Sequence, residues 1–318
     1  MLRRSIGTGL LALVWCISSP ALLAQLPRPL IPLAGEGNRV APFFDGWYEN
    51  PDGTISFSFG YSNLNKDTLV EIPLGPDNFI VPKEYDGRQP TSFPVLAPDT
   101  ADGGGGRGGS PAVSPATAAA RAPGAGGGTV GGERDRNRGV FTVTVPAGFK
   151  GDVVWTLRYA NQTHSVPARA KSTAYQLSWP AAMGSTPPML RFAEKGPSGR
   201  GPMGIQAPPL QAKAGTPLSL TIWLTDDAVH EKEPIKFGRE RPGMNVSWFK
   251  HSGPGPVGFS PQKVGFPALS GMATTLATFT EPGDYVVRVK ADAFGYPDSS
   301  SGNQCCWTNG YQKVTVTR

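Results

Sequence analysis

Apolar and polar residues alternate with a period of two along several short stretches of the chain, a pattern typical of half-buried β-strands. The clearest stretch is 55–62, where Ile, Phe, Phe and Tyr alternate with Ser, Ser, Gly and Ser. The motif Asn50-Pro51-Asp52-Gly53 precedes it and is a turn signal, because Pro presets φ and Gly permits a positive φ. We therefore predict a hairpin whose second strand is half buried.

Similar stretches recur in both halves of the chain, separated by turn residues. They are 69–74, 79–81, 141–145, 153–159, 218–224, 246–249, 274–279, 285–289 and 314–317. The sequence also holds 41 Gly and 33 Pro, which would interrupt long helices. We therefore predict an all-β protein of two β-sandwich domains.

The amino-terminal end has the features of an export signal. Arg3 and Arg4 precede a mostly apolar run at 6–17, and Ala21 and Ala24 offer small residues for cleavage. We predict a signal peptide at 1–24 and a Pro-rich lead at 25–37, and hence a periplasmic, cell-surface or extracellular protein. No later apolar run approaches about 20 residues, so we predict no transmembrane segment in the mature chain.

Composition divides the remaining chain. Segment 101–138 holds 12 Gly and no aromatic residue, so we predict a disordered insertion within an amino-terminal domain at 38–185. Prolines are frequent in 186–207, which we predict to be a linker or a long packed crossover. The carboxy-terminal domain is then 208–318.

The charge of the chain is positive, with a formal net value of +6 at pH 7. Two of the basic residues belong to the predicted signal peptide, and most of the remaining excess lies in 101–138 and 186–213. A nucleic-acid-binding domain would instead gather Lys and Arg on one folded face. We therefore predict no nucleic-acid partner.

The carboxy-terminal domain resembles a polycystic-kidney-disease-type (PKD-type) immunoglobulin-like repeat. The resemblance covers about 207–318 and rests on Val246-Ser247-Trp248, on Ser252-Gly253-Pro254-Gly255 and above all on 281–289, where Glu-Pro-Gly-Asp-Tyr leads into an alternating strand. It implies an extracellular, structural or adhesive domain, and the departure from the family is a long insertion at 292–308. The amino-terminal domain looks similar to uncharacterised exported bacterial β-sandwich proteins through 44–48 and 58–61. The predicted fold is therefore two immunoglobulin-like β-sandwich domains with a disordered Gly-rich insertion in the first.

Cys305 and Cys306 are the only cysteines after the signal peptide. Three interpretations remain open: a vicinal disulfide, two thiols that bind a metal or a partner, and an intermolecular bridge. An exported protein lies in an oxidising compartment, although adjacent Cα atoms only about 3.8 Å apart would strain the vicinal bridge. We favour the structural disulfide, because zinc would need four ligands and no second Cys pair or His cluster accompanies these two.

Candidate chemistry elsewhere is sparse. The three histidines do not form an H-E-x-x-H motif, and G-x-S-x-G is absent, so we predict no catalytic residues. Asp226 and Asp227 follow a predicted strand and are candidate calcium ligands, the only cofactor suggested. Asp at the end of a strand also commonly bonds to the backbone of a turn.

Tyr296 and Trp307 fall in the predicted insertion at 292–308, where exposed rings would contact a sugar or a protein. For Trp47 and Trp248 we predict burial. We therefore expect a non-catalytic binding or structural protein of the bacterial cell envelope, acting through its loops on an envelope protein or polysaccharide. The alternative is a secreted carbohydrate-active enzyme or enzyme accessory module, whose acids would be brought together only by folding.

Overall fold

The fold was analysed in a computed structural model of the chain. The structure describes residues 39–65, 68–95, 136–171, 175–177, 186–227, 244–266, 268–292 and 307–318. The predicted signal peptide, the Pro-rich lead and almost all of the predicted insertion at 101–138 lie outside the described residues. All of the described residues belong to one compact unit.

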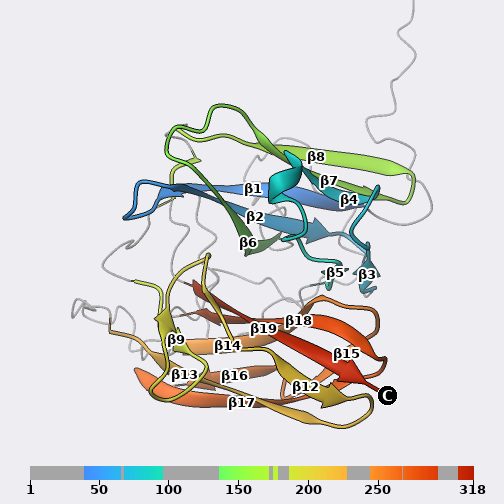
Figure 1. The fold of residues 1–318 in the computed structure, drawn as a ribbon, viewed down its shortest axis with the longest axis vertical. Coiled ribbons are helices and arrows are strands. Elements are labelled where there is room, and N and C mark those ends of the chain that lie inside the picture. Colours follow the sequence, from blue (N-terminus) through green and yellow to red (C-terminus); the bar gives the residue numbers. More distant parts are fainter. Residues whose placement is uncertain are drawn as a thin grey trace, which may run out of the picture. The chain divides into compact units, whose positions relative to one another are not determined.

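The amino-terminal sandwich is built from two main sheets of antiparallel strands (Figure 1). One has the order β1 (Val40–Glu49), β2 (Ile55–Asn63) and β6 (Arg136–Val145). The other has the order β4 (Asn78–Val81), β7 (Val153–Tyr159) and β8 (Gln162–Ala168). A short pair, β3 (Val70–Glu71) with β5 (Ser92–Phe93), and a 3-10 turn, η1 (Lys83–Tyr85), complete the described part of this half.

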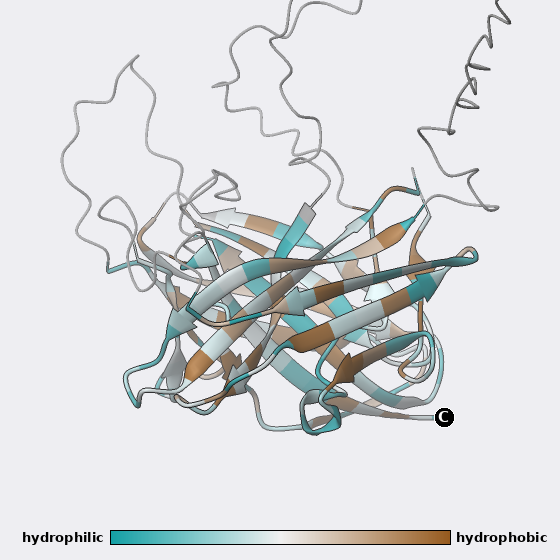
Figure 2. Cartoon of the chain, turned by 90° about the horizontal axis from the view of Figure 1, so that it is seen from above, coloured by the Kyte–Doolittle hydropathy of each residue, from teal (hydrophilic) through white to brown (hydrophobic). Residues whose placement is uncertain are grey.

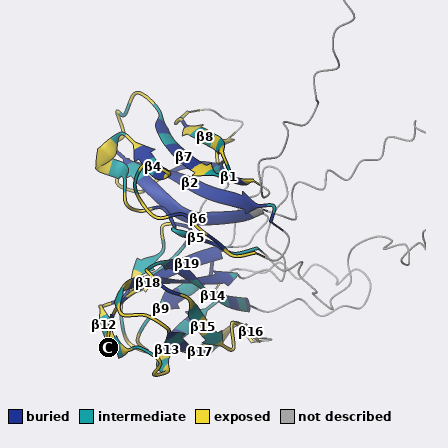
Figure 3. Cartoon of the chain, turned by 90° about the vertical axis from the view of Figure 1, so that its right-hand side faces the viewer, coloured by how far each residue is buried: buried dark blue, intermediate teal, exposed yellow. Residues whose placement is uncertain are grey.

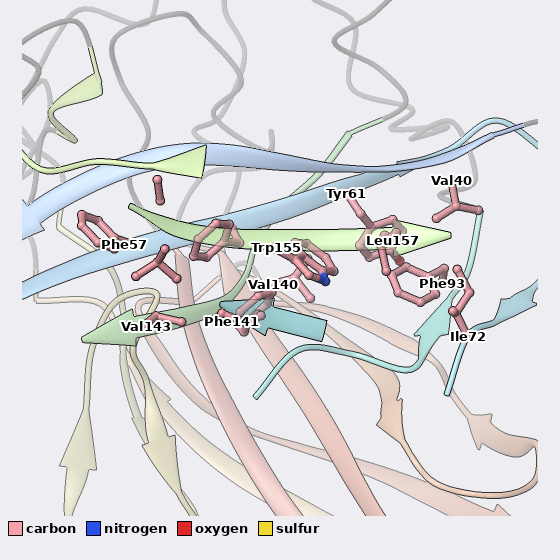
Figure 4. Packing of buried hydrophobic residues seen from close by; sticks show 14 of the residues in the cluster. Val40, Phe57, Tyr61, Ile72, Phe93, Val140, Phe141, Val143, Trp155 and Leu157 are labelled. Atoms are coloured by element: carbon pink, nitrogen blue, oxygen red, sulfur yellow. The ribbon is translucent and has the colours of Figure 1, made fainter. Parts of the chain in front are cut away.

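Aromatic residues fill the space between these sheets. Figure 4 shows Trp155 of β7 close to Phe141 of β6, with ring centroids 5.0 Å apart in an edge-to-face contact. Phe141 also stacks on Phe59 of β2 at 5.1 Å. The indole N–H of Trp155 donates to the side-chain oxygen of Asn78 at 3.0 Å, so its polar atom is satisfied inside the core.

The carboxy-terminal sandwich pairs a five-stranded sheet with a six-stranded one. The five-stranded sheet has the order β10 (Ser198–Gly199), β9 (Met189–Arg191), β13 (Leu218–Thr225), β17 (Ser270–Phe279) and β15 (Val257–Ser260). The other has β11 (Ile205–Gln206) and β12 (Leu210–Lys213) parallel to β19 (Trp307–Thr317), followed by β18 (Gly283–Asp292), β14 (Met244–Ser252) and β16 (Lys263–Phe266). Figure 2 shows hydrophobic and hydrophilic segments alternating along many of the strands.

Two local features identify this half as immunoglobulin-like. Trp248 on β14 is buried between the sheets, as predicted. The hydroxyl of Tyr285, near the start of β18, donates to the carbonyl oxygen of Glu281 at 2.8 Å and accepts from the N–H of Gly255 at 3.1 Å. A tyrosine bonded in this way at a strand corner is a hallmark of immunoglobulin-like sandwiches. The predicted all-β, immunoglobulin-like fold class is therefore confirmed.

The structure differs from the predicted elements in several places. All nine residues of β2 are buried, so the expectation of a half-buried strand was wrong (Figure 3). β6 begins at Arg136, so the end of the predicted insertion, 136–138, belongs to a strand. Segment 186–207 contains β9, β10 and β11, which join the carboxy-terminal sheets where a linker or crossover was expected. The hairpin through 50–53 is confirmed by the pairing of β1 with β2.

Candidate functional site

One face of β2 is polar and leads to a group of buried hydrogen bonds between the two sandwiches. Its apolar face packs into the aromatic core, yet Ser56, Ser58 and Ser62 on the other face are also buried. The same sheet approaches the carboxy-terminal sandwich at Gly139 of β6, where a Cβ atom would overlap the indole ring of Trp307. Gly139 has a φ of +56° and leaves room for this ring. The second face of the sheet is therefore covered by the other sandwich and is not open to water.

A chain of buried polar groups crosses between the two sandwiches. We call it the polar seam, and it consists of the side chains of Tyr61, Asn137, Arg288, Asn309 and Tyr311. The guanidinium of Arg288 donates to the side-chain oxygens of Asn137 and Asn309, each at 3.4 Å. The amide of Asn137 in turn donates to the hydroxyl of Tyr61 at 2.9 Å. Asn137 lies on β6 and Arg288 on β18, so strands from both sandwiches contribute.

The seam also bonds directly to the main chain of β6. The amide of Asn309 donates to the carbonyl oxygen of Gly139 at 2.6 Å and to that of Pro202 at 2.8 Å. The hydroxyl of Tyr311 donates to the carbonyl oxygen of Val140 at 2.9 Å. Each bond gives a main-chain oxygen a side-chain donor from another segment, which makes the arrangement specific for one position of the strands.

Burial dominates the electrostatics of the seam. It lowers the pKa of the Arg288 guanidinium from its usual value, while charge interactions with Tyr311, Tyr61 and Asp292 act in the opposite direction. Burial also raises the pKa of Tyr61 to about 12 and raises that of Tyr311, so both hydroxyls remain neutral donors. The guanidinium lies 4.7 Å from the ring centroid of Phe249, a cation–π contact.

Two buried residues of β14, His251 and Lys250, make further contacts with the amino-terminal sandwich. Nε2 of His251 donates to the carbonyl oxygen of Arg88 at 2.9 Å, and its backbone oxygen accepts from the N–H of Thr91 at 2.8 Å. Burial lowers the pKa of His251 to about 4, with a smaller contribution from the charge of Arg288. The ammonium of the neighbouring Lys250 pairs with Glu71 at 3.1 Å.

The predicted contact residues meet different outcomes. Trp307 is only 1% exposed, because its ring lies on Gly139 and under the ammonium of Lys290 at 5.3 Å, so it is a packing residue in this structure. The expectation of an exposed ring came from treating 307–308 as part of a loop, whereas β19 already begins at Trp307. Tyr296, Cys305 and Cys306 lie outside the described residues. The redox state of the two cysteines therefore stays a prediction.

The predicted calcium ligands occupy different environments. Asp226 is buried, and its N–H donates to the carbonyl oxygen of Leu269 at 2.7 Å. Asp227 is about half exposed and pairs with Arg200, whose hydrogen bond lowers the pKa of its carboxyl. Among the described residues, no group of three or more His, Cys, Asp or Glu side chains is placed to hold a metal ion. Calcium binding stays a prediction.

A separate apolar cavity of about 290 Å³ lies in the carboxy-terminal sandwich. Its walls combine buried core residues with half-buried residues and with exposed Pro208 and Ser219. They are Phe192, Pro208, Leu210, Ser219, Leu220, Thr221, Ile222, Trp223, Trp248, Val287, Val289 and Gln312. No carboxylate is among these lining residues, so the paired acids of the enzyme hypothesis are not found at this cavity, and that hypothesis stays a prediction.

Comparison with known proteins gives only distant likenesses. Neither a protein family nor a curated protein matches the chain. Similar solved structures include domains 4 and 5 of the S-layer protein SbsC, at 14% identity over 55% of this chain and 69% of that chain, with a TM-score of 0.24. The D00–D0 domain of intimin is 14% identical over 56% of this chain and 72% of that chain, with a TM-score of 0.24. The D0–D1 domain of intimin is 10% identical over 87% of this chain and 98% of that chain, with a TM-score of 0.23. With TM-scores this low, the fold assignment rests on strand order and on the Tyr285 corner.

The comparisons leave the PKD-type resemblance as a prediction, because no family matches the carboxy-terminal half. In the part of the chain that the structure describes, no helix has the length and apolar character needed to cross a membrane.

Proposed function

We propose that this chain is an exported, non-catalytic binding or structural protein of the bacterial cell envelope. In this proposal the two sandwiches act as one body that holds surface loops in fixed positions. Loops carried on a rigid scaffold are common binding elements, because the scaffold removes part of the ordering cost of binding. The export signal predicted at 1–24 supports the compartment.

The observation that carries the proposal is the anchoring of the two strands that flank segment 293–306. β18 contributes Arg288 to the polar seam, and β19 contributes Asn309 and Tyr311. The hydroxyl of Thr308 donates to the carbonyl oxygen of Pro188 at 2.5 Å and is wholly buried. Contacts with both sandwiches thus hold the ends of this connection, which a partner-binding loop would require.

A loop replacement tests this proposal. Asp292 and Trp307 are directly paired across β18 and β19, so 293–306 can be replaced by Asn-Gly, which forms a two-residue hairpin turn. The parent chain and this variant would be immobilised and incubated with solubilised bacterial envelope, and the retained components identified. A matched control changes Ala160→Asn and Asn161→Gly in the β7–β8 turn, where both residues already have a positive φ.

We expect the parent and the turn control to retain the same envelope component and the loop replacement to lose it. Circular dichroism and thermal unfolding would establish that both variants keep the parent fold. Retention of the same component by all three proteins would contradict a binding role for segment 293–306. Retention of no component by the parent would contradict a binding function in the envelope.

A further inference from the structure

One edge of β13 has no neighbouring strand over most of its length. β13 pairs with β17 along all eight residues, but on its other side β9 pairs only with Trp223, Leu224 and Thr225. In the described part of the chain no strand pairs with 218–222 on that side. Five residues of strand, about 17 Å, therefore present backbone groups that no adjacent strand bonds.

The path of the chain explains the gap. β9 belongs to the five-stranded sheet, whereas β11 and β12 pair with β19 in the opposite sheet. The segment that could have covered the edge of β13 has therefore changed sheets before it reaches 218–222. The strand order of the two sheets therefore explains why residues 218–222 have no partner strand on this side among the described residues.

The apolar cavity runs along this same edge. All of Ser219, Leu220, Thr221, Ile222 and Trp223 line it, although successive side chains of a strand point to opposite faces. Five consecutive residues can border one cavity only if it follows the edge of the backbone. The unpaired edge and the cavity are thus one composite site.

The two observations together favour a particular occupant. An apolar small molecule would fill the cavity but would leave the N–H and C=O groups of the edge without partners, which is costly once water is displaced. An extended peptide supplies main-chain groups to the edge and a side chain to the cavity, which is the general chemistry of strand addition. An apolar cavity of about 150 Å³ accommodates benzene, so the volume of about 290 Å³ here admits a large aromatic side chain.

We propose that residues 218–222 of β13 bind an extended segment of a partner protein by strand addition, with an aromatic side chain of that segment inserted into the cavity. Half-buried Phe192 and Leu210 and buried Trp248 line the cavity and would contact the inserted ring. No residue of this site belongs to segment 293–306, so we expect its binding to survive the loop replacement described above.

A designed peptide tests the proposal with the full chain. The probe is a dye-labelled heptapeptide with Lys at both ends, Thr alternating with apolar residues, and a central Phe. Two further versions carry N-methyl groups on alternate amides, which removes the donors from one edge of the peptide or from the other. Fluorescence polarisation measures the affinity, and hydrogen exchange monitors the amides of 219–222.

We expect saturable binding of the parent peptide, slower exchange at 219–222, and a loss of about tenfold or more in affinity for one N-methylated version only. Leu210→Arg, in the lining of the cavity, should weaken binding at least as much. Leu269→Arg, on an exposed residue of the same sandwich that does not line the cavity, is the matched control and should leave binding unchanged.

Three results would overturn the proposal. One is the absence of saturable peptide binding up to about 1 mM. If 1-decanol nevertheless raised the melting temperature, the cavity would be a small-molecule site and the proposal would still fail. The second is equal affinity of both N-methylated versions and the parent peptide. The third is an equal effect of Leu269→Arg and Leu210→Arg on peptide affinity. The peptide comparison does not depend on whether a protein variant folds.

Discussion

Protonation of His251 should destabilise the folded protein as the pH falls. Burial lowers the pKa of this group from 6.5 to about 4, and Nε2 donates to the carbonyl oxygen of Arg88. Nδ1 is also buried, and no described residue hydrogen-bonds to it. The neutral ring is therefore the form that fits, and protonation would place a further buried cation beside Lys250 and Arg288.

The pH window follows from the two pKa values. Between pH 6.5 and about 4 the unfolded chain binds a proton at His251 and the folded chain does not, so stability falls as the pH falls. Above pH 6.5 the contribution is fully present, and below about pH 4 no more is lost. The total loss corresponds to about 3 kcal/mol in the free energy of unfolding.

Urea unfolding followed by circular dichroism at pH 7, 6, 5 and 4 measures this loss. His251→Gln keeps a neutral donor near Arg88, so the stability of the parent relative to this variant should fall by about 3 kcal/mol between pH 7 and pH 4. His164→Gln is the matched control: His164 is only partly buried, and its pKa is lowered by weaker desolvation and by Arg39. If the parent and His251→Gln had parallel pH profiles, the assignment of a buried neutral imidazole would be refuted.

Three further substitutions test other parts of the structure by urea or thermal unfolding. Gly139→Ala adds a Cβ where the indole ring of Trp307 lies and where φ is positive, so it should lower the free energy of unfolding by about 3 kcal/mol. Gly53→Ala, at a positive φ with open space around it, is the control and should lower it by about 1 kcal/mol. Equal losses would contradict the packing of Trp307 on Gly139. Asn309→Ala removes the side-chain donor to two buried carbonyls and an acceptor of Arg288, so it should cost about 3 kcal/mol. Exposed Gln211→Ala is its control and should change stability little. Asp227→Asn breaks a surface ion pair and should change the free energy of unfolding by less than about 1 kcal/mol. If the calcium prediction is correct, millimolar calcium should raise the melting temperature of the parent but not of this variant.

The strands of both cores could be predicted from the sequence because their signal is local. Alternating apolar residues at 55–61 and 285–289 mark the side of each strand that packs inward, and the aromatic and aliphatic residues at these positions are indeed buried. The turn at 50–53 was equally local. These predictions needed no knowledge of what else in the chain lies nearby.

The polar seam could not be predicted in the same way, because its partners are distant in sequence. Arg288 follows the alternation of β18 and occupies a position that would normally face water, and its partner Asn137 is 151 residues away. Small serines on the second face of β2 likewise suggested solvent exposure. Only the presence of a second sandwich explains why polar residues on both surfaces are buried and bonded to each other.

The position of Trp307 was missed for a related reason. The sequence from Trp307 to Lys313 shows no clear alternation, so β19 was expected to begin only at Val314. Its first half is held by pairing with β18 and by bonds from Thr308 and Asn309 to other segments. The non-local contacts, and not the local pattern, determine where this strand begins.

We infer that the polar seam joins the two sandwiches into one cooperative unit. Differential scanning calorimetry of residues 25–318 tests this inference, because cooperative unfolding gives a calorimetric enthalpy equal to the van't Hoff enthalpy. We predict a single transition with equal enthalpies. Two resolved transitions, or a calorimetric enthalpy close to twice the van't Hoff value, would contradict the claim.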